Sequence, residues 1–367
     1  MYLHNPRFGL ISQVSKSWRA LCFDGQLWAD LDLSPFAGHL HPRTLSDILT
    51  HSAPFIQTLA FRGMDALTSS TLLSSLSTLS SDSTTPLPLT KLTTVDLRGC
   101  KSLTPDAIIA IVSNAPQLRD VNLKGVQAVN RDVLRCLTAL DSLESVDVSR
   151  CRGIDLEDVY RSLLRLDPKV ASQLKVLRFA GLRPSATPRG SPDLLCLIFD
   201  KLSSLQCLDL QGCDSISNSV LISACDELRR KARISPIRHL ILSRCTLLRP
   251  EIFPAMTGLF PELRILELAS IPRMFEGNSR LDKTVFNAFL SSLPLLEKLD
   301  LDETCGAGGF DDDTLQNLAN ASCLTHLNIG FAARVSPEAM VQFIRNRPTL
   351  RVFEADVSLY HLGCTKR

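Results

Sequence analysis

A nine-residue pattern of apolar positions recurs along the chain. In LTTVDLRGC, apolar residues stand at Leu92, Val95 and Leu97, and Cys100 follows three positions after the last of them. The same frame begins again at Ile56, Leu118, Leu143, Leu174, Leu205, Ile237, Leu263, Leu296, Leu324 and Leu350. Because apolar residues alternate within each copy, the pattern predicts a short strand with one face turned inward.

Between the copies, the apolar residues change to helical spacing. Clear examples are the segments 104–116, 155–166 and 336–348. Thr104 and Ser336 are each followed by proline and an acidic residue, which is typical of a helix start with a capping side chain. From Leu92 onward the copies begin 25 to 33 residues apart, at or just above the length of about 20–29 residues typical of leucine-rich repeats.

These units must stack, because each one alone would expose an apolar strand face and an apolar helix stripe. The predicted fold class is therefore α/β, a leucine-rich-repeat solenoid or horseshoe. Parallel strands are expected on its concave face and helices on its convex face. The cysteines that follow the strands are expected to turn into the core: Cys100, Cys151, Cys213 and Cys245.

Strand residues between the inward positions are predicted to point out of the concave face, since successive strand side chains alternate. This face is the predicted site for a protein partner. Its candidate residues are Asp96, Arg98, Lys124, Asp147, Arg178, Asp209, Gln211, Glu267, Asp300 and Asp302. The acidic residues favour a partner with basic side chains. An alternative is that they only pair with an arginine on the next strand, a contact that stabilises little.

Three insertions are alternative places for partner contacts or regulation, and the first two are candidates for phosphorylation. The segment 182–193 is rich in proline, serine and glycine and is predicted to be a loop. The segment 68–85 is rich in serine and threonine. In the segment 304–313, Asp311 to Asp313 are predicted to complement the dipole of a helix that begins at Leu315.

Composition narrows the class of partner. The chain has 40 basic and 38 acidic residues, a formal net charge of +2, which is too balanced to favour nucleic acid or a membrane surface. No apolar run approaches the roughly 20 residues of a transmembrane helix. The 12 cysteines follow no signal peptide, so reduced thiols and a cytoplasmic and/or nuclear location are predicted.

The sequence contains no motif that points to catalysis. A Gly-rich phosphate loop, a His-Glu-x-x-His helix and a Cys-x-x-Cys pair are all missing, and the seven histidines are scattered. We therefore predict no catalytic residue, no metal site and no cofactor.

The N-terminal segment does not follow the repeat. Leu10, Val14, Trp18 and Leu21 fall at helical spacing, and a second short helical turn carries Leu27 and Trp28. One interpretation is a helix that only caps the end of the solenoid core. The alternative comes from VSKSWRALCFDGQLWADLDLS, residues 14–34, which resembles the second half of an F-box, with its Val-x-Lys-x-Trp helix and following Leu-Trp.

An F-box directly ahead of cysteine-bearing leucine-rich repeats is the arrangement of the F-box and leucine-rich-repeat protein family. The resemblance implies that residues 1–34 form a partial F-box and residues 35–367 the solenoid. In that family the F-box binds the Skp-type adaptor of a cullin-based ubiquitin ligase, which assigns adaptor binding to the six apolar residues named above. The family's opening helix would lie upstream of Met1, so the F-box is expected to be truncated at its N-terminus.

The function implied by the resemblance is substrate recognition. The repeats would hold a target protein for ubiquitination and proteasomal degradation, and the chain would position it without supplying a catalytic group. The alternative is a leucine-rich-repeat scaffold or regulator outside a ligase, such as a GTPase-activating type. A nucleic-acid-binding or enzymatic protein is disfavoured by the charge balance and the missing motifs.

Overall fold

The structure, a computed structural model, describes most of the repeat region. The described residues are 15–17, 28–36, 44–45, 48–49, 52–64, 68–70, 72–73, 89–184, 191–272, 274, 283–305, 310–318, 321–330, 332 and 334–355. The chain divides into two compact units, Met1–Leu177 and Arg178–Arg367.

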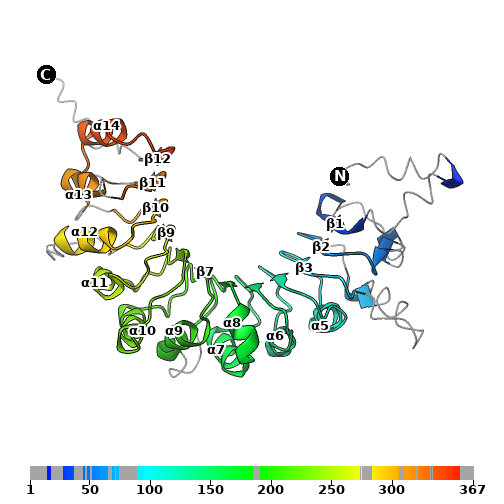
Figure 1. The fold of residues 1–367 in the computed structure, drawn as a ribbon. Helices are drawn as coiled ribbons and strands as arrows, with labels where there is room; N and C mark the ends of the chain where they lie inside the picture. Colours follow the sequence, from blue (N-terminus) through cyan, green and yellow to red (C-terminus); the bar gives the residue numbers. More distant parts are fainter. Residues whose placement is uncertain are drawn as a thin grey trace, which may run out of the picture. The chain divides into compact units, whose positions relative to one another are not determined.

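Three-residue strands alternate with helices in the first unit (Figure 1). Its strands are β1 (Asp30–Asp32), β2 (Thr58–Ala60), β3 (Thr94–Asp96), β4 (Asp120–Asn122) and β5 (Ser145–Asp147), and β6 (Val176–Arg178) begins at its end. Its helices are the 3-10 helix η2 (Ser34–Phe36), α5 (Pro105–Ser113), α6 (Arg131–Thr138), α7 (Leu156–Arg165) and α8 (Pro168–Gln173). The strands from β1 to β5 pair in parallel and in chain order.

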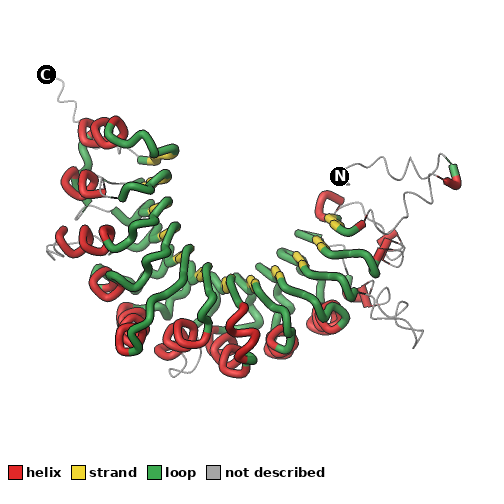
Figure 2. The backbone as a smooth tube through the Cα atoms, in the orientation of Figure 1, coloured by secondary structure: helices red, strands yellow, loops and turns green. Residues whose placement is uncertain are grey.

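The second unit repeats this arrangement. Its strands are β7 (Cys207–Asp209), β8 (His239–Ile241), β9 (Ile265–Glu267), β10 (Lys298–Asp300), β11 (His326–Asn328) and β12 (Val352–Glu354). Its helices are α9 (Ser191–Lys201), α10 (Asn218–Arg230), α11 (Ile252–Met256), α12 (Lys283–Ser291), α13 (Asp312–Asn317) and α14 (Pro337–Arg345). These strands also pair in parallel and in order, with Leu240 opposite Leu208 and Leu266. Figure 2 shows the helices on one side of the strands within each unit.

The first strand lies inside the segment that the sequence assigns to the F-box. In β1, Leu31 is opposite Leu59 of β2, and Asp30 is opposite Thr58. The sheet of the first unit therefore begins before residue 35.

The apolar frame forms the core, as predicted. In β3 the middle residue Val95 is buried while the strand residues on either side are half-buried, and Leu92 and Leu97 are also buried. Hydrophobic burial at about 25 cal/mol per Å² of apolar surface is the main stabilising contribution of such a unit. Among the described helices, none is long and apolar enough to cross a lipid bilayer.

The buried cysteines link successive repeats through hydrogen bonds. The Cys100 thiol donates to the carbonyl of Phe61, 2.9 Å away, and the Cys151 thiol to the carbonyl of Leu123, 3.2 Å away. Cys213 and Cys245 make the equivalent contacts. In each case the acceptor lies in the preceding repeat, so the predicted inward orientation of these cysteines is confirmed. The described cysteines are free thiols.

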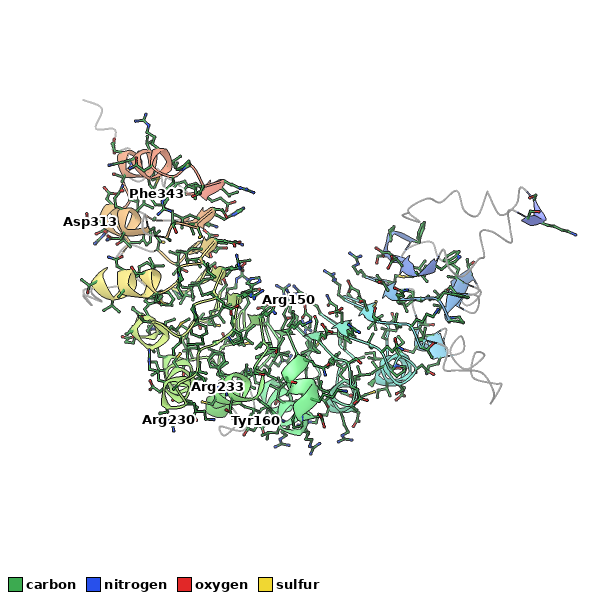
Figure 3. The ribbon with its side chains drawn as sticks, in the orientation of Figure 1. Arg150, Tyr160, Arg230, Arg233, Asp313 and Phe343 are labelled. Atoms are coloured by element: carbon green, nitrogen blue, oxygen red, sulfur yellow. The ribbon has the colours of Figure 1, made fainter. Side chains whose placement is uncertain are left out.

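A left-handed backbone turn follows many of the described strands, one position before the cysteine or the residue that takes its place. Gly99 adopts a φ of 73° there, a region that costs other residues energy. The same position is held by Arg150, Arg244, Ser270 and Glu303 in other repeats, with φ between 54° and 61°. In Figure 3, Arg150 lies on the strand side of the first unit. These repeats therefore carry local backbone strain.

Most of the predicted helix starts are confirmed. Asp155 and Asp158 form a capping box at α7, and the Ser336 side chain accepts a hydrogen bond from the Ala339 N–H. At α5, however, the Thr104 side chain makes no capping hydrogen bond. The backbone N–H of Thr104 instead donates to the Ser69 hydroxyl, 2.7 Å away.

The predicted insertions are partly helical where the structure describes them. Helix α13 begins at Asp312, three residues before the predicted start, because the Asp311 carboxylate caps the Thr314 N–H. Helix α9 begins at Ser191, inside the predicted loop 182–193. Residues 185–190 of that loop, and most of the segment 68–85, lie outside the described residues.

Candidate functional site

The candidate site is the strand face, defined as the side of each unit's sheet that points away from its helices. It corresponds to the predicted concave face. Each strand presents two residues there, one on either side of the buried middle residue. The candidate residues predicted from the sequence include only the second of them. The first is, for example, Thr94 in β3 and His239 in β8.

The second position has a structural role in most repeats. Its side-chain oxygen accepts a hydrogen bond, 2.9 to 3.2 Å long, from the backbone N–H two residues later. The residues that do so are Asp32, Asp96, Asn122, Asp147, Asp209, Asp300 and Asn328. Such Asx turns satisfy backbone N–H groups where the chain leaves the strand. The recurrence of aspartate and asparagine therefore has a local structural cause.

In the first unit, ion pairs join neighbouring strands at this face. Arg62 contacts Asp32 at 2.9 Å and Asp96 at 3.4 Å, and Arg98 contacts Asp96 at 2.6 Å. The two arginine side chains are about half exposed. Such exposed pairs contribute only about 0–1 kcal/mol each, so the guanidinium groups remain able to contact a partner.

The other predicted residues of this unit differ in exposure. Lys124 is half-buried. Asp147 is only 7% exposed, and Ser149, which follows it on the same face, is buried. Asp147 is therefore a poor direct contact, whereas Arg98 and Lys124 present charge at the surface.

In the second unit, three charged residues from adjacent strands meet. The Glu267 carboxylate lies 3.1 Å from the Lys298 Nζ and 3.6 Å from the His239 Nε2. At the longer distance, His239 Nε2 makes an ion pair when protonated but no hydrogen bond. We call these three residues the charged triad. Glu267 was predicted as a site residue, whereas His239 and Lys298 were missed because they occupy the first outward position.

The triad perturbs the protonation of its members. Burial lowers the pKa of His239, but polar interactions with Cys207 and Glu267 outweigh burial and raise this pKa from 6.5 to about 9. The interaction with His239 is the main cause that lowers the pKa of Glu267 from 4.5 to about 2, against the opposing effect of burial. At neutral pH the triad therefore carries two positive charges and one negative charge.

Acidic side chains lie beside the triad on β10. Burial raises the pKa of Asp300, and the negative charges of Glu267 and Glu354 add to the effect. Asp302 lies two residues further on, close to Gly330, where an added Cβ would clash with the Asp302 carboxylate oxygen. Gly330 thus leaves room for the Asp302 side chain at the face. Arg178 and Gln211 are half-buried, and Asp209 is 8% exposed.

Of the residues predicted to bind an adaptor, the structure describes one. Trp28 is half-buried and lies two residues before the first strand. Leu10, Val14, Trp18, Leu21 and Leu27 lie outside the described residues. The F-box assignment stays a prediction.

Within the described part of the chain, no group of three or more His, Cys, Asp or Glu side chains is arranged to hold a metal ion. What the arrangement offers is a row of fixed, mixed charges on short strands, which suits recognition of a complementary surface.

Comparisons with known proteins agree with this architecture. A family model described as "Leucine Rich repeat" matches residues 89–112, which include β3 and most of α5. No curated protein matches the chain in sequence. A chain in the crystal structure of the yeast Rad7 and Elc1 complex is similar with a TM-score of 0.55 and 15% identity, over 96% of this chain and 92% of that one. The leucine-rich repeat-containing protein LegL7 from Legionella pneumophila has a TM-score of 0.42 and 14% identity, over 87% and 88% of the two chains. The predicted fold class is confirmed: the chain is an α/β leucine-rich-repeat solenoid.

Proposed function

We propose that the chain is the substrate-recognition subunit of a Skp-cullin-F-box ubiquitin ligase. It binds a target protein through the strand face, and an N-terminal F-box attaches it to the Skp-type adaptor and through that to a cullin. The chain contributes no catalytic group, and the ligase complex acts in the cytoplasm or nucleus. Ubiquitination of the bound target then leads to its proteasomal degradation.

The strand face is the observation that carries the binding role. Solenoids use such extended faces to bind partners, and this one holds half-exposed charges at fixed positions on consecutive strands. In the second unit the triad stands beside Asp300 and Asp302, so positive and negative groups alternate along the face. A target with a matching alternation of charges fits this surface better than one of a single sign.

The resemblance of residues 14–34 to an F-box supports the ligase role. β1 lies within this segment, so an adaptor bound there would be next to the first strand of the solenoid. The fold is also compatible with stable assembly, because one chain of similar fold was crystallised in a complex of two proteins, Rad7 and Elc1.

Adaptor binding is tested by a pull-down with the purified Skp-type adaptor. The chain, and a form extended by its upstream coding sequence where one exists, should retain the adaptor, and Trp18→Ala should abolish retention. The control is Gln342→Arg, a change on the exposed surface of α14 far along the sequence. Loss of binding in Trp18→Ala with an unchanged circular dichroism spectrum supports an F-box contact. Equal retention by both variants contradicts it.

Target binding by the strand face is tested with a matched pair of substitutions. Gln211→Arg adds bulk and charge to the strand face and keeps the hydrogen bond of the Gln211 backbone N–H to Asp209, and Gln342→Arg makes the same change on a helix. Quantitative mass spectrometry of co-purified proteins should show targets that are lost with Gln211→Arg and retained with Gln342→Arg. If the two variants retain the same proteins equally, the target does not bind the strand face.

A leucine-rich-repeat scaffold outside a ligase is the second candidate. It is favoured by the family match, which concerns the repeat itself. Failure of both forms of the chain to bind the adaptor, together with selective loss of partners in Gln211→Arg, would support the scaffold.

A further inference from the structure

A groove lies on the helix side of the first unit, between α6 and α7. These helices pack against each other (Figure 1), and Tyr160, labelled in Figure 3, lies on α7. The groove has a volume of about 420 Å³. Its lining residues are Arg131, Arg135, Thr138, Ala139, Asp158, Arg161, Ser162 and Arg165.

The groove is rich in arginine because of helix periodicity. Arg131 and Arg135 are four residues apart on α6, and Arg161 and Arg165 are four apart on α7. Residues at this spacing share one face of a helix. Each helix therefore presents a pair of guanidinium groups to the same groove.

Only part of this positive charge is neutralised. Arg131 is hydrogen-bonded to Asp158, a carboxylate that is 6% exposed and also accepts the Asp155 N–H within the capping box. Arg161 contacts Glu157 at 2.7 Å. Arg135 contacts Asp132 at 3.3 Å, and both of these side chains are about two-thirds exposed.

The fourth arginine, Arg165, is exposed and has no ion pair with any residue that the structure describes. Exposed pairs such as Arg135–Asp132 contribute only about 0–1 kcal/mol, so an incoming anion easily replaces them. Arg135 and Arg165 are therefore the two cations available to a ligand. The Thr138 and Ser162 hydroxyls already donate to helix carbonyls, so the arginines must carry recognition.

We propose that this groove binds a phosphorylated segment of a partner polypeptide through its phosphate group. Guanidinium groups bind phosphate through paired N–H donors, and a phosphate monoester has a charge of about −1.5 to −2 at neutral pH. That charge balances the two positive charges of the available arginines, whereas a carboxylate side chain balances only one of them. Nucleic acid is less suited, because its affinity depends on many successive phosphates and the groove spans only two helices.

This site is separate from the strand face and does not depend on the ligase role. It gives the chain a second contact whose strength follows the phosphorylation of its partner. Asp158 fixes Arg131 at the wall of the groove, so that part of the site is formed before the ligand arrives.

The test is fluorescence anisotropy with a labelled peptide of glycine, serine and alanine that carries one phosphothreonine. Peptides with threonine or glutamate in its place, and a single-stranded oligonucleotide of equal length, are the comparisons. The phosphopeptide should bind more tightly than all three. Its affinity should fall as pH is lowered through about 6, where the phosphate takes up its second proton.

The variant for this test is Arg135→Gln combined with Arg165→Gln, and it should weaken phosphopeptide binding by about tenfold or more. The matched control is Arg119→Gln, which removes another exposed arginine whose ion pair, to Glu144, is also 3.3 Å long. Arg119→Gln should bind as the unchanged chain does. Three results overturn the proposal: unaltered binding by the double variant, equal affinity for the glutamate peptide, or tighter binding of the oligonucleotide.

Discussion

The Asp147 carboxylate accepts a hydrogen bond of 2.9 Å from the backbone N–H of Ser149, two residues further along the chain. Both residues are buried, so water cannot replace this bond. Asp147, which the sequence pattern predicts as a binding residue, therefore closes the turn at the end of β5.

Asp147→Ala should destabilise the first unit by about 1–3 kcal/mol, because it removes a buried acceptor of the Ser149 N–H. Asp147→Asn keeps an acceptor oxygen at the same place and should cost much less. Urea unfolding followed by circular dichroism measures both. If Asp147→Asn is as damaging as Asp147→Ala, the charge of Asp147 matters rather than its turn-closing bond.

The buried cysteines should resist alkylation in the folded protein. Burial is the main cause that raises the pKa of Cys151, Cys213, Cys225 and Cys245 to about 12. Since the thiolate is the reactive form, iodoacetamide at about pH 8 should leave these four unmodified.

Cys136 and Cys323, which are half-buried, should react faster under the same conditions. Peptide mass spectrometry after timed labelling gives the rates, and the urea-unfolded chain is the control in which all of them react. Rapid labelling of Cys213 without unfolding would contradict the inward contact that it makes with the Phe179 carbonyl.

Removing the strained backbone at Arg244 should stabilise the second unit. Its φ is 61°, and Gly212 has a φ of 64° at the same position of the preceding repeat. Arg244→Gly removes the strain of a left-handed backbone at a residue with a Cβ. Glycine also increases the entropy of the unfolded chain, which opposes this gain, so the net increase in the free energy of unfolding should be about 0.5–1 kcal/mol.

The reverse change, Gly212→Ala, should cost about 1 kcal/mol. An added Cβ at Gly212 meets no atom within 4 Å, so the cost isolates backbone conformation from steric contact. Denaturation midpoints that move in the same direction for both variants would contradict this account.

The sequence predicted the parts of the fold that depend on a periodic physical requirement. Positions such as Leu92, Val95 and Cys100 must be apolar or small because they lie between layers, and their spacing alone predicts strands and helices in the right order. The caps at Asp155 and Ser336 were equally readable, since helix N–H groups need acceptors wherever a helix begins.

The candidate site was harder to predict, because it depends on contacts between repeats and on local hydrogen bonds that produce no periodic pattern in the sequence. The alternation of the strand residues predicts that Asp147 and Asp209 point outward. Both are nevertheless buried, since each side chain folds back onto the turn that follows it. His239 and Lys298 meet Glu267 only because β8, β9 and β10 pair in register. The arginine groove depends in the same way on the packing of α6 beside α7.

The charged triad should make the stability of the second unit depend on pH at both ends of the range. The folded-state pKa of His239 is raised from 6.5 to about 9, so its contribution is fully present below pH 6.5 and is lost as pH rises through about 9. The pKa of Glu267 is lowered from 4.5 to about 2, so its contribution is fully present above pH 4.5 and is lost as pH falls through about 2. Both contributions are complete only between pH 4.5 and 6.5.

NMR titration of the His239 ring measures the shift of its pKa directly. Glu267→Gln should lower the pKa of His239, because the carboxylate that raises it is removed while the burial that lowers it remains. Glu354→Gln, on β12, is the control that should leave it unchanged, and an unaltered His239 titration in Glu267→Gln would show that the carboxylate does not hold the proton on the ring.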